Sequence, residues 1–300
     1  MKILLLGKNG QVGWELQRSL APLGKVIALA SDSQDHCGDL SNLSGLAQTV
    51  RDIAPDIIVN AAAYTAVDKA EAEFELAHTI NALAPAVLAQ EAKRSGAWLL
   101  HYSTDYVFDG NGDKPWRESD ATGPCNVYGQ SKLAGEAAIQ AAGCQHLIFR
   151  TSWVYAARGN NFAKTMLKLA QERDSLKVID DQIGAPTGAD LLADVSAHAI
   201  RSALQRPEVS GLYHLTASGQ TSWHGYASFV INAARQAGVT IQLATEAIDA
   251  VASSAFVSAA QRPLNSRLDC TKLQNTFDLS LPHWQNGVLR LLTELLENPS

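Results

Sequence analysis

Long apolar runs, basic clusters and paired cysteines are all absent from this 300-residue sequence. No apolar stretch approaches the ~20 residues that a membrane-spanning helix requires. A groove for nucleic acid would need a positive stripe, whereas 24 basic and 30 acidic residues give a net charge of −6. The four cysteines include no C-x-x-C pair, which argues against a disulfide scaffold or a structural zinc site. These absences predict a cytoplasmic protein with reduced thiols that binds neither membranes nor nucleic acids.

Hydrophobic residues make up 46% of the chain, enough for a substantial core. In the first half, short apolar runs alternate with stretches whose apolar residues recur at helical spacing. The predicted strands are Lys2–Leu6, Lys25–Ala30, Asp56–Asn60, Trp98–Tyr102 and His146–Arg150, and the predicted helices are Val12–Leu20, Leu43–Ile53, Leu83–Arg94 and Val127–Ala141. Repeated strand–helix–strand units with apolar strands predict an α/β fold built on a Rossmann-type doubly wound parallel sheet.

The alternation is less regular after about Thr151. Here the predicted elements are helices over Asn161–Glu172, Ala189–Leu204, Trp223–Ala237 and Trp284–Glu297, with a short strand at Gly211–Leu215. We expect residues 1–150 to form a NAD(P)-binding domain and residues 151–300 a smaller C-terminal substrate-binding lobe, with a soft boundary that late segments cross. Ligands of open parallel sheets bind beyond the carboxyl ends of the strands, so the expected site is the cleft between the lobes.

A glycine triplet, Gly7-Lys8-Asn9-Gly10-Gln11-Val12-Gly13, follows the first predicted strand and opens the first helix. Glycines allow a tight turn and let a pyrophosphate approach backbone N–H groups at the positive end of a helix. The spacing is G-x-x-G-x-x-G, and an ordinary glycine-rich turn is the alternative. Its place between a strand and a helix favours dinucleotide binding.

The end of the second strand bears on the choice between NADPH and NADH. An acidic residue there would hold the adenosine ribose of NADH, but the chain has Ala30-Ser31. Lys8 is the nearest cation by sequence that could serve a 2′-phosphate, so we expect NADPH to be preferred while NADH acceptance stays open. Asp39 and Leu40 could contact the adenine, although a helix N-cap is an equally good interpretation of Asp39.

Tyr128 and Lys132 stand four residues apart and therefore share one helix face. Thr104 is expected at the end of the fourth strand. Hydride attack on a ketone builds negative charge on oxygen, which requires a proton donor and a second hydrogen bond. A phenol has a pKa near 10, and a nearby ammonium is expected to lower it. The eight histidines show no metal-ligand spacing, so we expect structural roles for all of them.

In their order and spacing, eight segments resemble the extended short-chain dehydrogenase/reductase superfamily, and within it the dTDP-4-dehydrorhamnose reductase family. The segments are Gly7–Gly13, Val59–Asp68, Tyr102–Gly110, Asn126–Glu136, Arg150–Tyr155, Gly159–Phe162, Asp181–Thr187 and Arg262–Ser266. The resemblance covers nearly the whole chain. It implies an NADPH-dependent enzyme that reduces the 4-keto group of dTDP-6-deoxy-L-lyxo-4-hexulose to give dTDP-L-rhamnose.

The resemblance also assigns residues to roles. Tyr128 would be the proton donor, Lys132 its electrostatic partner and a ribose ligand, and Thr104 the ligand of the carbonyl. The cofactor-binding set is Gly7, Lys8, Gly10, Gln11, Val12, Gly13, Asp39, Leu40, Ala62, Ala63, Tyr64, Tyr102, Tyr128 and Lys132. The set expected at the sugar nucleotide is Thr65, Thr104, Asp105, Trp153 and Arg262. For Trp153 a core aromatic, and for Arg262 a solvated surface arginine, are the alternatives.

Two features of the family stay open. Many relatives carry Asp where this chain has Ala30, and its loss removes a repulsion against a 2′-phosphate. Some relatives use Mg²⁺ at a dimer interface, but the sequence offers no compact carboxylate cluster, so metal binding is undetermined. Homodimerisation is compatible with the sequence, and no sequence feature proves it.

Other functions on the same fold are a sugar-nucleotide 4-epimerase or dehydratase. Dehydration typically recruits an Asp-Glu pair beside the threonine, whereas Thr104 is followed by Asp105-Tyr106. A non-enzymatic alternative is the regulatory subunit of an S-adenosylmethionine synthetase, which resembles these reductases. The intact set of Thr104, Tyr128 and Lys132 favours the reductase.

Overall fold

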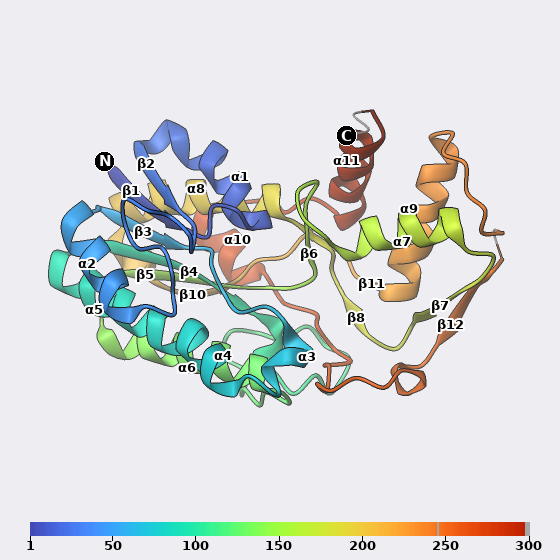
Figure 1. Cartoon of the computed structure of the whole chain (residues 1–300), viewed down its shortest axis with the longest axis horizontal. Coiled ribbons are helices and arrows are strands. Elements are labelled where there is room, and N and C mark those ends of the chain that lie inside the picture. Colours follow the sequence, from blue (N-terminus) through green and yellow to red (C-terminus); the bar gives the residue numbers. More distant parts are fainter. Residues whose placement is uncertain (245, 298–300) are drawn as a thin grey trace.

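Six parallel strands form the central sheet of the computed structural model, which describes residues 1–244 and 246–297 (Figure 1). The chain begins at an inner strand next to one edge of this sheet, adds that edge strand and then returns to build the other side. The doubly wound parallel sheet predicted from the sequence is therefore confirmed. In spatial order the strands are β2 (Lys25–Leu29), β1 (Lys2–Leu6), β3 (Ile57–Asn60), β4 (Trp98–Thr104), β5 (His146–Thr151) and β10 (Gly211–His214).

Successive residues of each strand face opposite sides of the sheet, and both sides are covered by helices. In β1, Ile3 and Leu5 join one core while Leu4 and Leu6 join the other. The first core is closed by α1 (Gln11–Leu20), α8 (Ala189–Gln205) and α10 (Thr271–Phe277), and the second by α2 (Leu43–Ile53), α5 (Ala84–Ser95) and α6 (Val127–Ala142).

The predicted elements of the first half are confirmed to within two residues at each end. Between β3 and α5 the prediction was incomplete, because three short helical segments follow one another there. They are α3 (Val67–Ala70), α4 (Phe74–His78) and the π-helical turn η2 (Thr79–Leu83). Single 3₁₀ turns complete the helices: η1 (Ala21–Leu23), η3 (Asp105–Val107), η4 (Pro207–Val209) and η5 (Ser253–Ala255).

The second lobe lies beyond one end of the sheet (Figure 1). Its apolar cores include Tyr226 and Trp284 in one cluster and Met166 and Ile231 in another. Two segments of the second half, β10 and α8, belong to the sheet layer instead. The lobe is built from α7 (Phe162–Glu172), α9 (Trp223–Gln236) and α11 (Trp284–Glu297), with the strand pairs β7 (Leu176–Ile179) and β12 (Ile248–Val251), β8 (Ile183–Gly184) and β11 (Thr221–Ser222), and β6 (Val154–Tyr155) and β9 (Thr187–Gly188). Residues 298–300, at the end of the predicted second domain, lie outside the described residues.

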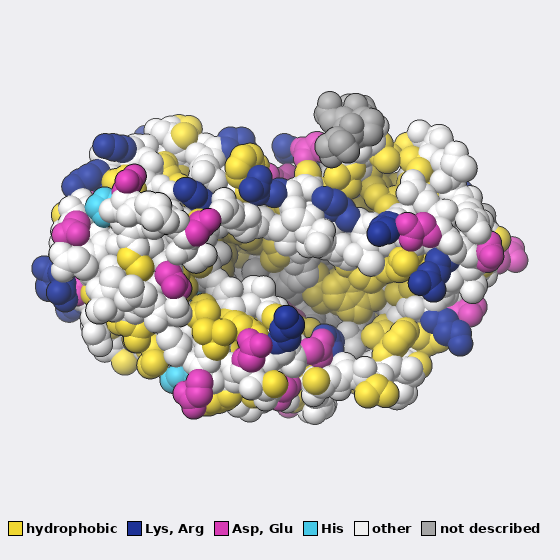
Figure 2. Space-filling view, in the orientation of Figure 1, with side chains coloured by type: hydrophobic (Ala, Val, Ile, Leu, Met, Phe, Trp, Pro, Cys, Tyr) yellow, Lys and Arg dark blue, Asp and Glu magenta, His cyan; other side chains and the backbone are white. Residues whose placement is uncertain are grey.

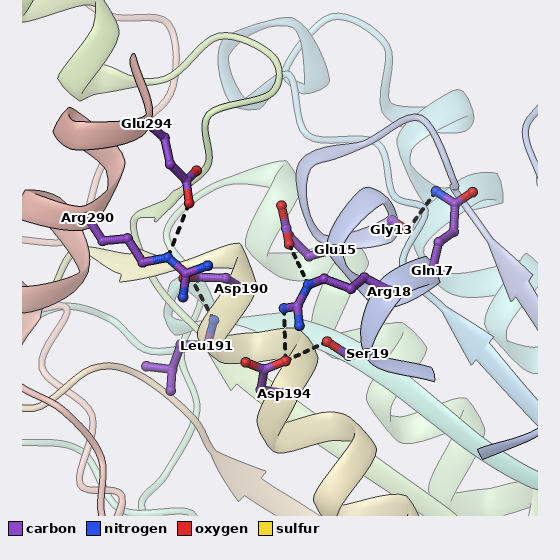
Figure 3. A network of polar contacts seen from close by, with 10 residues as sticks. All are labelled: Gly13, Glu15, Gln17, Arg18, Ser19, Asp190, Leu191, Asp194, Arg290 and Glu294. Carbon is purple, nitrogen blue, oxygen red and sulfur yellow. Dashed lines mark hydrogen bonds and ion pairs between the residues drawn. The ribbon is translucent and has the colours of Figure 1, made fainter. Parts of the chain in front are cut away.

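Polar contacts tie three helices together where the lobes meet (Figure 3). Arg18 of α1 donates to Asp194 of α8 at 2.9 Å. Arg290 of α11 lies 3.4 Å from Asp190 of α8 and 3.1 Å from Glu294. These pairs are partly exposed and therefore contribute little free energy each. Within the described ranges, no helix is both long and apolar enough to cross a membrane.

Candidate active site

A cleft of about 640 Å³ lies at the carboxyl ends of the sheet strands. Figure 2 shows the surface hollowed between the lobes, with hydrophobic side chains on the wall of the hollow. The structure brings together twelve of the predicted site residues along this cleft. They are Gly7, Gly10, Gln11, Val12, Asp39, Leu40, Ala62, Ala63, Thr65, Tyr102, Tyr128 and Lys132. The other predicted residues, namely Lys8, Gly13, Tyr64, Thr104, Asp105, Trp153 and Arg262, lie beside the cleft or beyond it.

The glycine loop connects β1 to α1 and packs tightly on the end of β3. Gly7 has φ +86°, and a Cβ there would lie 2.8 Å from the Ala62 nitrogen. At Gly13 a Cβ would lie 2.0 Å from the Gly7 carbonyl oxygen. The first turn of α1 thus sits directly on the loop, with its positive end toward the cleft, an arrangement that suits a pyrophosphate.

A Gly13→Ala substitution should lower the Tm by several degrees and weaken NADPH binding roughly tenfold or more, because overpacking costs about 1–3 kcal/mol. The matched control is Gly10→Ala, since Gly10 has ordinary extended backbone and a Cβ there would lie 3.4 Å from the Gly7 oxygen. Thermal unfolding without cofactor separates the two substitutions. Equal Tm values for both variants would show that the contact between Gly13 and Gly7 does not limit this loop.

Just after β2, Ala30 and Ser31 line the cleft and present no carboxylate. Lys8 lies in an adjoining groove of about 510 Å³, which Asp32 and His36 also line. The N-cap interpretation of Asp39 is wrong: its carboxylate accepts hydrogen bonds from the Ser41 N–H (2.9 Å) and hydroxyl (2.8 Å). Asn42 is the residue that caps α2.

Helix α6 places Tyr128 and Lys132 on the cleft wall, one turn apart. Burial raises the pKa of Tyr128 to about 12, an effect that nearby Asp105 increases and the Thr104 hydroxyl reduces. Burial dominates the pKa of Tyr128, so the net shift is upward rather than the lowering expected from Lys132 alone. With a pKa near 12, the phenol keeps its proton at neutral pH, as a proton donor must.

Lys132 is buried, with 2% of its surface exposed. Its ammonium donates to the Tyr102 carbonyl oxygen at 2.6 Å, and its Nζ lies 3.2 Å from His101 Nε2. Burial lowers the pKa of Lys132 to about 8, although the Glu136 carboxylate opposes this shift. Lys132 can therefore lose a proton close to neutral pH.

Thr104 ends β4 beside Tyr128, and its hydroxyl donates to Asp105 Oδ1 at 3.1 Å. Thr104 Oγ1 in turn accepts a hydrogen bond from the Tyr106 N–H. Burial raises the pKa of Asp105 to about 6, while hydrogen bonds from Ser266 and Thr104 oppose this shift. Asp105 Oδ2 is buried and has no hydrogen-bond partner within the described part of the chain. This corner of the site thus holds one rotatable hydroxyl and one underused acceptor.

The backbone after β3 is held by Asn81, which the sequence did not identify. Its side chain accepts the Tyr64 N–H (2.9 Å) and donates to the Tyr64 carbonyl (3.0 Å) and to Ser131 Oγ (3.0 Å). The loop lining the cleft is thereby fixed to α6. The Tyr64 hydroxyl itself donates to Glu73 at 2.6 Å, which raises the pKa of Tyr64 to about 12.

A second cleft of about 270 Å³ lies in the second lobe, lined by residues that include Tyr106, Phe162, Trp223 and Arg262. Trp153 stacks on Trp223 with ring centroids 3.7 Å apart, so it belongs to the aromatic cluster behind this cleft. The Tyr106 ring meets the Tyr128 ring edge-on at 5.7 Å, which places the phenol of Tyr128 near both clefts.

Two charged features bear on ligands. Arg262 forms an ion pair with Asp68 at 2.5 Å and is 28% exposed, so its guanidinium is held at the second cleft by a carboxylate.

For a Mg²⁺ site, the carboxylates to consider lie between α1, α8 and α11, where they face Arg18 and Arg290 (Figure 3). Among residues 1–244 and 246–297 there is no group of three or more side chains that could hold a metal ion.

A doubly wound sheet, a glycine loop under a helix and a tyrosine–lysine pair on the cleft wall define an oxidoreductase of the extended short-chain dehydrogenase/reductase type. Residues 1–297 match the family described as RmlD substrate binding domain. The chain is 62% identical over 295 residues to a dTDP-4-dehydrorhamnose reductase of Salmonella typhimurium, covering 98% of each chain. The chain therefore belongs to the dTDP-4-dehydrorhamnose reductase family.

Solved structures agree with this assignment. A dTDP-4-dehydrorhamnose reductase from Clostridium acetobutylicum has a TM-score of 0.87 at 34% identity, covering 99% of this chain and 100% of the other. The enzyme of the same name from Bacillus anthracis, solved in complex with NADP, has a TM-score of 0.86 at 34% identity and covers 98% and 99% of the two chains.

Proposed function

We propose that this enzyme reduces the 4-keto group of dTDP-6-deoxy-L-lyxo-4-hexulose with NADPH and releases dTDP-L-rhamnose, the last step in making that sugar nucleotide. The observation that carries the proposal is the position of Tyr128 and Lys132 on the wall of a cleft that the glycine loop also lines, with the Thr104 hydroxyl beside Tyr128. Residues 1–150 supply most of the cofactor site, and the sugar nucleotide extends toward residues 151–300.

NADPH, when bound, supplies a hydride to the sugar C4. Tyr128 donates its phenolic proton to the developing oxygen anion, and the Thr104 hydroxyl turns from Asp105 to hydrogen-bond the same oxygen. The Lys132 ammonium stabilises the phenolate that Tyr128 becomes. The sugar and its diphosphate are assigned to Thr65, Asp105 and Arg262, with Trp153 backing the aromatic wall.

The cofactor site fits NADPH. The glycine loop and the N-terminus of α1 offer N–H groups to a pyrophosphate, and we assign the nicotinamide to the part of the cleft lined by Ala62 and Ala63, with Tyr64 next to them in the chain. Ala30 and Ser31 carry no carboxylate, so nothing at these two positions repels a 2′-phosphate. Lys8 lies in the adjoining groove. The Bacillus anthracis relative was solved with NADP, which supports the same preference here.

An Ala30→Asp substitution should reverse this preference, lowering kcat/KM for NADPH and raising it for NADH, with a combined change of roughly tenfold or more. The matched control is Ala30→Asn, which adds the same volume without a charge. Steady-state kinetics with both cofactors measure the ratio. Equal kcat/KM for NADPH and NADH in the wild type would already contradict the preference.

The reaction is tested by following NADPH absorbance with enzymatically prepared dTDP-6-deoxy-L-lyxo-4-hexulose and identifying the product by NMR. We expect stoichiometric conversion to dTDP-L-rhamnose. Binding of NADPH without its consumption would leave the cofactor site standing and reject the substrate. A screen of other sugar-nucleotide ketones would then be the next step.

A further inference from the structure

A chain of buried polar groups runs from Lys132 into the sheet below the cleft. His101 on β4 and Asn60 on β3 are register partners in adjacent strands. Lys132 Nζ lies 3.2 Å from His101 Nε2, and His101 Nδ1 lies 3.1 Å from Asn60 Nδ2. His101 and Asn60 are each 1% exposed. Because these groups are shielded from water, the protonation state of each depends on its neighbours.

Asn60 determines which ring nitrogen of His101 carries the proton. The Ala62 N–H donates to Asn60 Oδ1 at 3.2 Å, which turns the amide NH₂ of Asn60 toward His101 Nδ1. An NH₂ donor requires a lone pair on Nδ1, so the proton of a neutral ring lies on Nε2. Burial and the neighbouring Lys132 lower the pKa of His101 well below its usual value, which keeps the ring neutral.

The Nε2–H of His101 therefore points at Lys132, where it suits a neutral amine better than an ammonium. Apart from His101, the groups that face Lys132 are the Tyr102 carbonyl oxygen, which accepts from it at 2.6 Å, Glu136 one turn later on α6, and Tyr128 one turn earlier. Glu136 favours the ammonium, but its carboxylate is engaged by Arg150 at 2.6 Å.

We propose that His101 is a positioning residue that offers an Nε2–H donor to Lys132, so that the amine left when Lys132 gives a proton to Tyr128 is hydrogen-bonded at once. In the proposed reaction, the Tyr128 O–H bond breaks and the proton joins the sugar oxygen. A Lys132 N–H bond then breaks, its proton restores the Tyr128 O–H, and the electron pair left on Nζ accepts the His101 Nε2–H. Solvent returns a proton to Lys132 after product leaves. Only these transfers rest on the proposed function; the position of the ring proton does not.

The ring proton can be located by ¹⁵N NMR on the full-length chain with labelled histidine, with no substrate present. Loss of one ring signal in His101→Gln assigns the resonances. We expect Nε2 to carry the proton and Nδ1 to be bare. A proton on Nδ1, or on both nitrogens, at neutral pH would overturn the proposal.

Asn60→Asp tests the role by reversing the hydrogen bond. A carboxylate still accepts the Ala62 N–H but presents its other oxygen to Nδ1, so the ring proton should move to Nδ1 and leave Nε2 as an acceptor that stabilises the ammonium. We expect kcat to fall about tenfold and the basic limb of the pH profile to move up by about one unit, the size of one charge-assisted hydrogen bond.

Asn42→Asp is the matched control, because Asn42 caps α2 through its side-chain oxygen and its amide nitrogen donates no hydrogen bond to the described residues, so Asp serves equally well there. It adds the same charge without touching His101, so the ring proton should stay on Nε2 and kcat should be nearly unchanged. A tautomer change in Asn60→Asp with no change in kcat or in the pH profile would reject the positioning role. If the wild type did not turn over the sugar, the NMR result would still decide the tautomer. If Asn60→Asp does not fold, the position of the ring proton in the wild type decides whether the proposal stands.

Discussion

Replacing Tyr128 by phenylalanine should lower kcat by a factor of roughly 100 to 10,000, the usual contribution of a positioned general acid. The benzene ring keeps the edge-on contact with Tyr106, so only the proton donor is lost. KM for NADPH and the Tm should therefore change little. Steady-state kinetics and thermal unfolding on the same preparation separate a chemical defect from a structural one.

Tyr106→Phe is the control for this substitution, because it removes a hydroxyl from the neighbouring ring. Tyr106 lines the second cleft beside Arg262, so its loss should raise KM for the sugar nucleotide more than it lowers kcat. If Tyr128→Phe retained most of its kcat, another group would have to supply the proton. Asp105, whose pKa is raised to about 6, would be the first to examine.

Most of the sheet could be predicted because its strands carry their own signal. The two-sided burial of β1 and β3 demands continuous apolar runs, and these are visible in the sequence. The segment from Val67 to Leu83 could not be predicted as well, since its helices are only four or five residues long and one is a π turn that breaks the 3.6-residue period. The two-residue strands of the second lobe form only by pairing with segments distant in the sequence, so no local pattern predicts them.

The cofactor side of the site could be predicted for the same reason. Gly7 to Gly13 and the pair Tyr128 and Lys132 lie within single turns, so their spacing alone indicates their geometry. His101 and Asn81 act across the fold: they reach α6 from β4 and from the π turn, and nothing in their sequence neighbourhood marks that contact. The prediction of structural roles for all histidines did not anticipate the contact of His101 with Lys132. Trp153 stayed ambiguous because its stacking partner, Trp223, comes 70 residues later.

Glu136→Gln should lower the free energy of unfolding by about 3–5 kcal/mol, because it leaves the Arg150 guanidinium as an uncompensated buried charge. Glu136 and Arg150 form a two-point contact at 2.9 and 2.6 Å, and both are less than 5% exposed. The guanidinium also lies over the Phe108 ring at 5.0 Å, so it cannot turn toward water. Urea unfolding measures the loss.

Glu91→Gln is the matched control for the buried pair. Glu91 is a buried carboxylate too, but its partners Arg51 and Arg94 have side chains that are 51% and 55% exposed and stay hydrated when it is neutralised. Glu91→Gln should lower the free energy of unfolding by about 1 kcal/mol or less.

Adding Arg150→Met to Glu136→Gln should restore much of the stability, because no buried charge then remains unpaired. Equal losses in the two single variants would show that the cost comes from the carboxylate itself. The Glu136 variant should also move the basic limb of the pH profile downward, since Glu136 is the group that favours the Lys132 ammonium.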